Sequence, residues 1–248
     1  MMDIIITMAG NGRRFREAGY DLPKYQISAH GRTLFEWSML SLANFWQAGA
    51  RATFVTQREH DAAEFIHRHA ARCGITSVSI VELDALTAGQ ATTALAAAAA
   101  VEDRTQPMAV FNIDTYVHPS HLRPQDVRGQ GWIPCFPGAG DGWSFAKVDE
   151  SLRVLEVREK VRISPWATIG LYYFDSFARY QSLYEEHFAK ADGMEKGERY
   201  IAPMYNTLLE QQRDVYIACL PPDAIIPMGT PAELNAFIDR EPPAEQLA

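Results

Sequence analysis

The stretch that decides the fold is DIIITMAGNGRRF, residues 3–15, which is followed by Pro23-Lys24. Its run from Ile4 to Thr7 is apolar or β-branched and carries no charge. Such a run is typical of a strand that is buried on both faces, as strands of a parallel sheet are. The stretch therefore predicts an α/β protein with this strand inside the sheet.

The loop after this strand has the composition of an anion site. Gly10 and Gly12 carry no side chains, so the backbone could approach a ligand closely. Arg13, Arg14 and Lys24 bring positive charge to the same place. Free backbone N–H groups and cations at the end of a parallel strand favour a phosphate chain as the ligand.

Two better-known phosphate loops do not fit. The dinucleotide fingerprint needs a third glycine and an immediate helix, but position 15 is Phe, and Gly19 and Pro23 oppose a long helix. The P-loop needs Gly-Lys-Ser/Thr, which does not occur in the sequence. The loop is therefore of another kind.

The length, composition and net charge of the chain limit the functions that it could have. The chain has 248 residues, of which 47% are hydrophobic and 22% charged, so it could form one α/β domain with a large core. Its net charge of −8 and the lack of a long basic run disfavour nucleic-acid binding. A local cationic pocket on an acidic protein could still bind anionic substrates.

Cysteine usage and hydropathy predict a cytoplasmic protein. The three cysteines lie far apart, without Cys-x-x-Cys or Cys/His metal spacing, which suits a reducing compartment. The N-terminus lacks the basic region of a signal peptide, and no run reaches the roughly 18–20 apolar residues of a membrane span. We therefore expect no membrane partner.

The first half of the chain alternates strands with helices. The patterns predict strands at 3–7, 52–56, 75–81 and 108–111 and helices at 33–48, 59–72 and 90–101. Thr33 is expected to cap the first of these helices, and Gly49 to end it. Such alternation implies right-handed crossovers and a mostly parallel sheet.

The second half has a different pattern. We expect strands at 132–136, 144–148, 154–157, 167–174 and 214–219, helices at 175–189 and 199–211, and a last helix from Pro231. The polar tail, Glu241 to Ala248, is expected to be frayed.

Asn112-Ile113-Asp114 follows a predicted parallel strand. Ligands of open α/β sheets bind beyond the carboxyl ends of strands, so Asp114 should face the same crevice as the first loop. A carboxylate beside phosphates calls for a cation, and Mg²⁺ binds carboxylate and phosphate oxygens together. Taken alone, Asp114 is better interpreted as a turn-forming residue that caps the next segment, whereas together with the first loop it favours the metal.

The segment LTAGQATT, residues 86–93, opens the alanine-rich helix. Gly89 allows close approach, and Gln90 could pair with the edge of a nucleobase. Thr92 and Thr93 could cap the helix or touch phosphate. On these residues alone an ordinary helix start is an equal interpretation.

His60 and His67 are seven residues apart and could share a helix face. Because no carboxylate or cysteine pattern accompanies them, we interpret this face as solvated rather than as a metal site.

The pattern Ala9-Gly10-x-Gly12-x-Arg14-Phe15 with Pro23-Lys24 resembles the signature of nucleotidyltransferases that make nucleotide-activated sugars and alcohols. Further segments recur in the order that this family has them: Gly89-Gln90-x-x-Thr93, Gly142-Trp143-Ser144, Glu159-Lys160, Thr168 to Tyr172 and Gly197 to Ile201. From residue 3 to about 238 the chain is similar to the bacterial sugar-1-phosphate nucleotidyltransferases of capsule and lipopolysaccharide synthesis.

The resemblance implies one nucleotidyltransferase domain, residues 1–240, with a nucleotide-binding half at 1–115 and an acceptor-binding half at 116–240. The implied fold is Rossmann-like: a mixed, mostly parallel sheet flanked by helices. The implied reaction is NTP + R-phosphate → NDP-R + pyrophosphate, as a step toward a surface polysaccharide. The partners would be an NTP and a phosphorylated small molecule, and the resemblance leaves room for a homo-oligomer.

The resemblance also implies roles for individual residues. Arg14 and Lys24 would bind the phosphates and Asp114 would hold Mg²⁺, as the catalytic set. The nucleotide would be held by Ala9, Gly10, Asn11, Gly12, Arg13, Gln90, Thr92 and Asn112. The acceptor would be held by Gly142, Glu159, Lys160, Gly170, Glu198 and Tyr200.

Two departures from the family pattern concern the metal and the acceptor. Family members of the thymidylyl and guanylyl types usually have Asp just before a late Gly-Thr, whereas this chain has Pro227-Met228-Gly229-Thr230. We expect Asp223 to supply the second metal carboxylate, with Glu233 as the other candidate. In addition, Val161 rather than Pro follows Glu159-Lys160, which leaves the acceptor open among hexose, heptose, polyol and aminoalcohol phosphates.

Other functions stay in view at this stage. One is a catalytically silent homologue that binds nucleotide sugars and regulates a partner, and another is a cytidylyltransferase for a non-sugar phosphate. A glycosyltransferase of similar architecture usually carries Asp-x-Asp, where this chain has Asn112-Ile113-Asp114.

Overall fold

The computed structural model describes residues 1–243. Most of the frayed tail predicted for Glu241 to Ala248, namely 244–248, lies outside the described residues.

Four parallel strands form one side of the main sheet, in the order β5-β4-β1-β6. Their bounds are Asp3–Thr7 for β1, Arg51–Gln57 for β4, Val78–Leu83 for β5 and Met108–Asn112 for β6. In β1, Ile5 is paired with Thr53 on one side and with Val110 on the other. The parallel arrangement expected for the first half of the chain is thus confirmed.

The second half of the chain continues the same sheet with antiparallel strands. Strand β12 pairs with β6, and the order runs on through β8, β11, β9 and β10, while β13 lies parallel to β8. Within residues 1–243 this sheet has ten strands. The second-half strands are β8 (Gly131–Pro137), β9 (Ser144–Val148), β10 (Val154–Glu159), β11 (Trp166–Thr168), β12 (Leu171–Phe174) and β13 (Val215–Cys219).

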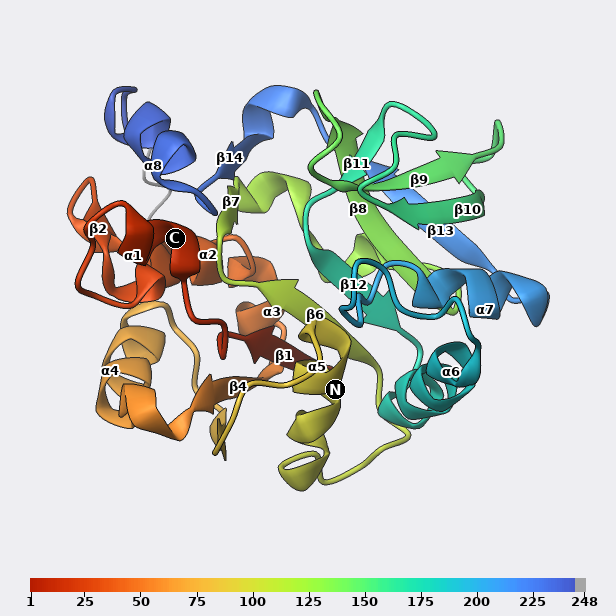
Figure 1. Ribbon diagram of the computed structural model, residues 1–248, viewed down its shortest axis with the longest axis horizontal. Coiled ribbons are helices and arrows are strands. Elements are labelled where there is room, and N and C mark those ends of the chain that lie inside the picture. The colour runs from red at the N-terminus through yellow and green to blue at the C-terminus, as the bar shows by residue number, and fades with distance from the viewer. Residues whose placement is uncertain (244–248) are drawn as a thin grey trace.

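Helices cover both faces of the sheet (Figure 1). One face packs against α2 (Leu34–Leu40), α3 (Ala43–Gln47) and α4 (Ala63–Arg72), and the other against α5 (Gln90–Ala96), α6 (Phe177–Ala189) and α7 (Met204–Glu210). Strand β1 shows both contacts, because Ile4 and Ile6 belong to the first cluster and Ile5 to the second, all fully buried. At about 1.5–3 kcal/mol for each buried side chain, this strand anchors the fold from both sides.

Smaller elements carry the loops of the site. Strands β7 (Thr115–Val117) and β14 (Ile225–Pro227) form a separate antiparallel pair, which brings a late segment of the chain next to Asp114. The others are α1 (Arg13–Glu17), α8 (Pro231–Ile238), the hairpin β2 (Ser28–Ala29) and β3 (Arg32–Thr33), and the 3₁₀ helices η1 (Lys24–Gln26), η2 (Arg58–His60), η3 (Ala97–Ala99), η4 (Pro119–His121), η5 (Pro124–Asp126) and η6 (Pro222–Ala224).

The sequence prediction was wrong at several element boundaries. The helix predicted at 33–48 is divided into α2 and α3, although Thr33 caps it as expected, in a reciprocal pair with Glu36. The helix predicted at 59–72 begins only at Ala63, because Asp61 has a left-handed φ of 43° that a helix cannot contain. The helix predicted at 199–211 begins at Met204, because Arg199 forms backbone hydrogen bonds with residues 88 and 91 instead. The strand predicted at 167–174 is divided at Gly170, whose φ is 82°.

Candidate active site

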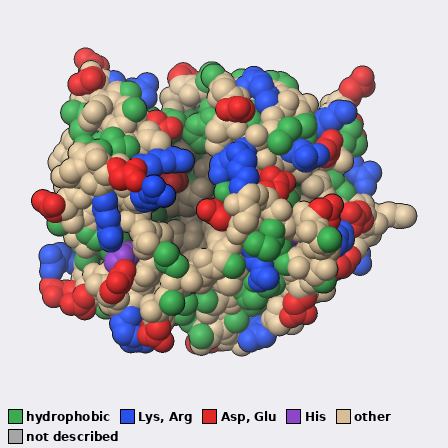
Figure 2. Space-filling view, viewed as in Figure 1, with side chains coloured by type: hydrophobic (Ala, Val, Ile, Leu, Met, Phe, Trp, Pro, Cys, Tyr) green, Lys and Arg blue, Asp and Glu red, His purple; other side chains and the backbone are tan. Residues whose placement is uncertain are grey.

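A cavity of about 560 Å³ opens where the two halves of the sheet meet. Figure 2 shows this face hollowed near its centre, with Lys, Arg, Asp and Glu side chains around the rim. The cavity lies at the carboxyl end of β6 and faces β9, β10 and β12 of the second half. It is lined by nine of the residues expected from the sequence: Arg14, Gln90, Asn112, Asp114, Gly142, Glu159, Lys160, Gly170 and Tyr200.

One end of the cavity carries an ion pair between Lys24 and Asp114. The Lys24 Nζ lies 2.8 Å from Asp114 Oδ2, and about a quarter of each side chain is exposed. Asp114 follows β6, and Lys24 begins η1 after the glycine loop. Lys24 and Asp114 are 90 positions apart in the sequence, and they meet because both lie in loops at the carboxyl ends of parallel strands.

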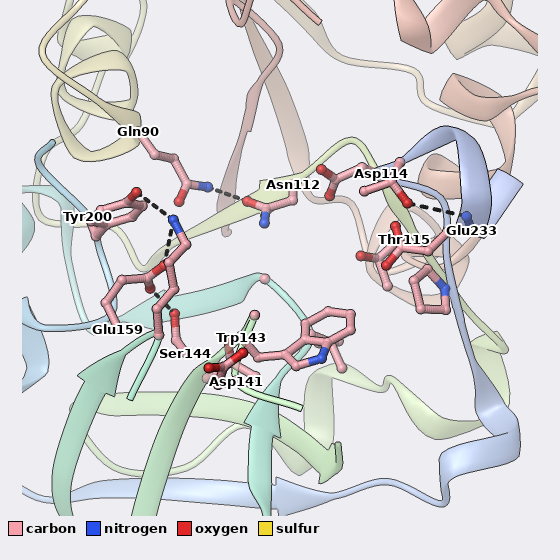
Figure 3. A pocket seen from close by; sticks show the side chains of 18 of the residues that line it. Gln90, Asn112, Asp114, Thr115, Asp141, Trp143, Ser144, Glu159, Tyr200 and Glu233 are labelled. Atoms are coloured by element: carbon pink, nitrogen blue, oxygen red, sulfur yellow. Dashed lines mark hydrogen bonds and ion pairs between the residues drawn. The ribbon is translucent and has the colours of Figure 1, made fainter. Parts of the chain in front are cut away.

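Two amide side chains lie beside this ion pair. The Gln90 Nε2 donates to Asn112 Oδ1 (Figure 3). It also donates to Thr7 Oγ1 at 3.3 Å. A third amide, Gln57, holds the glycine loop by donating to the Ala9 carbonyl at 2.5 Å and to Asn11 Oδ1 at 3.0 Å. Amides present both donors and acceptors, so this end suits the polar edges of a nucleoside. The sequence prediction did not include Gln57. It is the last residue of β4, and side chains at the carboxyl ends of parallel strands are expected at the ligand site.

Two glycines allow close contacts around these amides. A Cβ at Gly170 would collide with the Asn112 side chain, and the backbone there is left-handed. A Cβ at Gly89 would lie 2.6 Å from the Arg199 nitrogen, because the backbone of residues 88–91 is hydrogen-bonded to Arg199. The segment that carries Gln90 is thereby joined to the loop that carries Tyr200.

The opposite wall of the cavity carries Glu159 and Lys160 (Figure 3). Glu159 is buried and accepts a hydrogen bond from the Ser144 hydroxyl. The Lys160 Nζ donates to the Tyr200 hydroxyl at 2.7 Å and lies 3.6 Å from Glu159 Oε1 and 4.6 Å from the Tyr200 ring centre. The pair is thus part of a network and not the exposed charge pair that its sequence alone would allow.

Burial controls the charges of this wall. Burial raises the pKa of Glu159, and the Ser144 hydroxyl and the Lys160 ammonium only partly offset this. Burial also lowers the pKa of Lys160, but the hydrogen bond to Tyr200 and the charges of Glu159 and Glu198 outweigh it, so the pKa is raised overall. Lys160 therefore stays a cation that can bind a phosphate.

Tyr172 lies beside Ser144, the hydroxyl partner of Glu159, and was not selected from the sequence. Its hydroxyl lies 3.0 Å from Thr168 Oγ1 and 3.4 Å from Ser144 Oγ, and its pKa is raised by burial and by the Glu159 charge. Tyr172 belongs to the segment Thr168 to Tyr172, which resembles the family. Only the pairing of β12 with β8 and β6 places its side chain at the cavity.

The two carboxylates near Gly229 fit a divalent cation. A Cβ at Gly229 would lie 3.2 Å from Asp114 Oδ2 and 3.5 Å from Glu233 Oε2, so both oxygens face one place that glycine leaves open. Within residues 1–243 no group of three or more His, Cys, Asp and Glu side chains could hold a metal ion. Mg²⁺ does not need one, since it usually takes one or two carboxylates and completes its shell with water and phosphate oxygens.

The expectation that Asp223 faces the crevice was wrong. Asp223 lies in η6 and lines a separate hollow of about 430 Å³ with His118, His121 and Arg240. The carboxylate next to Asp114 is Glu233 of α8, because the pairing of β14 with β7 brings the chain after β14 back over Asp114.

Four other residues expected at the site line neither the cavity nor the hollow beneath the glycine loop. Arg13 is exposed and bound to Glu17, and the Thr92 hydroxyl pairs with the Tyr184 hydroxyl at 2.9 Å. The remaining two are Ala9, which is buried under the loop, and Glu198, whose backbone pairs with Glu195.

A second, smaller hollow of about 90 Å³ lies between the glycine loop and the segment that carries Lys24. The expected residues Gly10, Asn11, Gly12 and Lys24 line it. His60 lines it too, so the interpretation of this histidine as part of a solvated helix face was wrong: its side chain is only 6% exposed, and it precedes α4.

The fold and the cavity define an α/β protein with a ligand site at the carboxyl ends of its parallel strands. The crystal structure of the nucleoside-diphosphate-sugar pyrophosphorylase from Vibrio cholerae RC9 is 35% identical, with a TM-score of 0.89, and the match covers 96% of this chain and 100% of that one. The chain therefore belongs to the nucleoside-diphosphate-sugar pyrophosphorylase family, as its sequence resemblance predicted.

Two more distant structures share the fold. The inositol-1-phosphate CTP transferase from T. maritima is 16% identical with a TM-score of 0.72, over 95% of this chain and 92% of that one. A UDP-glucose pyrophosphorylase complexed with UDP-glucose is 17% identical with a TM-score of 0.74, over 96% and 98%. A scan against protein-family models and a search of curated proteins found no match.

Among the helices of residues 1–243, none has the length and apolar character needed to cross a bilayer.

Proposed function

We propose that the protein transfers a nucleotidyl group from an NTP to the phosphate of a sugar phosphate or related ester and releases pyrophosphate. The observation that carries this proposal is the arrangement of one cavity: amides and the Lys24–Asp114 pair at one end, and the Glu159–Lys160 pair on the opposite wall. Membership of the family supports it. As part of the same proposal, the product serves as an activated precursor for a surface polysaccharide.

In this mechanism the nucleoside lies against Gln90 and Asn112, whose amides are held in place by each other and by Thr7. Gly170 leaves the space that this contact needs. Arg14, which lines the cavity, and Lys24 bind the triphosphate. The α-phosphorus then lies between these cations and the acceptor wall.

The acceptor binds on the opposite wall. A sugar or polyol hydroxyl donates to the Glu159 carboxylate, which Ser144 orients, and the acceptor phosphate lies near Lys160, which Tyr200 holds in place. An acceptor oxygen attacks the α-phosphorus in line, and the bond to the leaving pyrophosphate breaks. No covalent nucleophile of the protein is needed, because positioning and charge neutralisation carry phosphoryl-type transfers.

Asp114 and Glu233 would hold a Mg²⁺ ion in this site. When bound, the ion would supply charge neutralisation for the phosphate oxygens. The Asp114 carboxylate also forms the 2.8 Å ion pair with Lys24. The ion and the incoming phosphates would each attract one partner of that pair.

The proposal is tested by incubating the protein with each of the four NTPs and a panel of hexose, heptose, polyol and aminoalcohol phosphates. We expect pyrophosphate release that depends on one NTP and one acceptor, with the nucleotide-activated product seen by ³¹P NMR. Lys24→Met should abolish it, whereas Lys190→Met, in an exposed ion pair with Glu210, should not. Nucleotide-sugar binding without release of pyrophosphate would instead identify a catalytically silent homologue.

A further inference from the structure

Arg199 does not line the cavity, but it holds together two segments that do. Its backbone N–H donates to the Ala88 carbonyl at 2.8 Å, and its carbonyl accepts from the Ala91 N–H at 3.0 Å. Gly89 lies between these contacts with a φ of 133°, and a Cβ there would lie 2.7 Å from the Arg199 carbonyl oxygen. This close approach needs a glycine, so the two backbones form one joint.

The Arg199 side chain extends this joint to α6. One guanidinium N–H donates to the Tyr184 hydroxyl, and the guanidinium carbon lies 5.4 Å and 5.3 Å from the ring centres of Tyr184 and Phe188. Both distances fall within the roughly 6 Å range of cation–π contacts. The Tyr184 hydroxyl also lies 2.9 Å from Thr92 Oγ1. Because a guanidinium can only donate, the tyrosine hydroxyl accepts from Arg199 and keeps its own proton for a hydrogen bond to Thr92.

The joint carries one residue for each of the two substrates. Gln90 lies within the segment that Arg199 holds, Tyr200 follows Arg199 directly, and both line the cavity. The Gln90 amide donates to Asn112 at the nucleoside end. The Tyr200 hydroxyl accepts from Lys160 on the acceptor wall. A displacement of the joint therefore moves groups that serve both substrates.

Stability alone is a poor reason for an arginine at this position. The Arg199 Nε is buried and has no hydrogen-bond partner within residues 1–243. A buried donor without an acceptor costs stability, and the cost is larger for a charged group. An apolar side chain beside the two rings would avoid that cost. It could not supply the hydrogen bond to the Tyr184 hydroxyl, which fixes the joint to α5 and α6 at once.

We propose that Arg199 is a positioning residue, which holds Gln90 and Tyr200 in one fixed arrangement so that the nucleoside and the acceptor are aligned together. The inference rests on the proposed function. In-line transfer requires the acceptor oxygen and the α-phosphorus to be oriented toward each other, and small displacements of positioning groups lower the rate strongly. Arg199 acts through the two cavity residues and itself touches neither substrate.

The test begins with steady-state kinetics of Arg199→Met, which keeps an unbranched side chain but has no N–H donor. We expect kcat to fall at least about tenfold and the KM values for the NTP and for the acceptor both to rise, because both walls lose their common support. Tyr184→Phe, which removes only the hydroxyl, should change the same constants in the same direction. The double variant should lose less than the two single losses combined, since both substitutions remove the same hydrogen bond.

Two further variants serve as controls. Arg199→Lys should recover part of the rate, because an ammonium can still donate to the tyrosine hydroxyl. Arg179→Met should keep the wild-type constants, because Arg179 lies on the same helix as Tyr184 but forms its ion pair with Asp175.

Amide hydrogen exchange of the full-length protein without ligands tests the joint independently of turnover. In Arg199→Met, exchange should be faster than in the wild type in both 86–93 and 197–202, while strand β12 keeps its protection. Unchanged exchange in 86–93, or a KM change for only one substrate, would overturn the inference. If Arg199→Met fails to fold, Tyr184→Phe decides by the same two measurements.

The inference and the proposed function can fail separately. Absent turnover of the wild type with every NTP would overturn the proposed function, and the exchange measurement would still decide whether Arg199 joins the two segments. Turnover of the wild type with unaltered kinetics in Arg199→Met would overturn the inference alone.

Discussion

Two lysine–carboxylate pairs face each other across the cavity, and they are built differently. Lys24 and Asp114 are 90 residues apart in sequence, bind each other at 2.8 Å, and keep about a quarter of their side-chain surfaces exposed. Glu159 and Lys160 are neighbours in sequence, but their charged groups lie 3.6 Å apart and each has a further partner, Ser144 or Tyr200.

The two pairs therefore differ in function. Lys24 and Asp114 can each exchange their partner for a ligand, whereas Glu159 and Lys160 are held in position by other side chains. Ion pairs with access to water contribute only about 0–1 kcal/mol, so a phosphate or a metal ion can replace either partner of Lys24–Asp114 at low cost. Glu159 is buried in the sheet with its hydrogen bonds already made, so its wall is preorganised before the acceptor binds. Five experiments would break or sharpen this comparison.

The largest effect is expected at Asp114. Asp114→Ala should abolish Mg²⁺-dependent turnover and leave the fold intact, because the carboxylate lies on a strand end and its side chain is partly exposed. The measurement is pyrophosphate release against Mg²⁺ concentration, with circular dichroism as the check on folding. Asp126→Ala is the matched control, since Asp126 of η5 forms an ion pair with Arg123 and does not line the cavity. Undiminished turnover in Asp114→Ala would remove Asp114 from the metal site.

The next effect concerns the cations of the same end. Lys24→Ala and Arg14→Ala should each lower kcat at least about 10²-fold, the scale for losing a preorganised charge-stabilising donor. Lys24→Arg should not rescue the rate, because a planar fork differs in reach from a compact ammonium. Steady-state kinetics measure both, and near wild-type rates in the alanine variants would mean that these cations are only solvated.

On the opposite wall we expect an effect on the acceptor only. Glu159→Gln keeps the shape of the side chain but removes a charged acceptor, so the KM for the acceptor should rise at least about tenfold while the KM for the NTP stays unchanged. Ser144→Ala should shift the same constant in the same direction, because it removes the hydroxyl that orients Glu159. An equal change in both KM values would contradict the separation of the two walls.

A smaller effect is expected at Glu233. Glu233→Gln should weaken Mg²⁺ activation severalfold, less than about tenfold, because Mg²⁺ takes most of its ligands from water and phosphate. Direct Mn²⁺ binding by electron paramagnetic resonance checks this without turnover. Asp223→Asn, in the separate hollow, is the matched control and should keep the wild-type metal dependence. If only the Asp223 variant changed, the assignment of Glu233 would fail.

The smallest effect is on stability. Because burial raises the pKa of Glu159 in the folded state, the contribution of this group to stability is fully present below its unfolded pKa and is lost as the pH rises through the folded value. Glu159→Gln, which cannot ionise, should therefore raise the Tm at neutral and alkaline pH, and the gain should vanish in acid. Thermal unfolding between pH 4 and 8 measures it, at the ordinary range in which carboxyl groups titrate. A lowered Tm at neutral pH would mean that the ionised form is favoured by its partners.

Much of the fold could be predicted because the sequence patterns that indicate its strands and helices involve residues close together in the chain. The uncharged run of β1, the cap at Thr33 and the alternation of strands with helices each depend on neighbouring residues, and the parallel sheet was confirmed. The predictions failed where distant contacts decided the backbone, as at Arg199, whose bonds to residues 88 and 91 prevent an earlier start of α7.

The sequence by itself determined the family, the glycine loop, and the placing of Asp114 and of Glu159-Lys160 at the cavity. Strand periodicity, glycine spacing and the position of ligand sites at strand ends suffice for the glycine loop and Asp114, since each relates residue type to a nearby backbone position. The family and the placing of Glu159-Lys160 came from the resemblance of several segments in their shared order.

Only the tertiary structure decided that Glu233, and not Asp223, lies beside Asp114, and that His60 is buried against the glycine loop. It also placed Tyr172 beside Ser144, the hydroxyl partner of Glu159, through the pairing of β12 with β6. The physical reason is common to all three: which side chains meet depends on strand pairing and packing between segments far apart in sequence, and local propensity carries no information about those contacts.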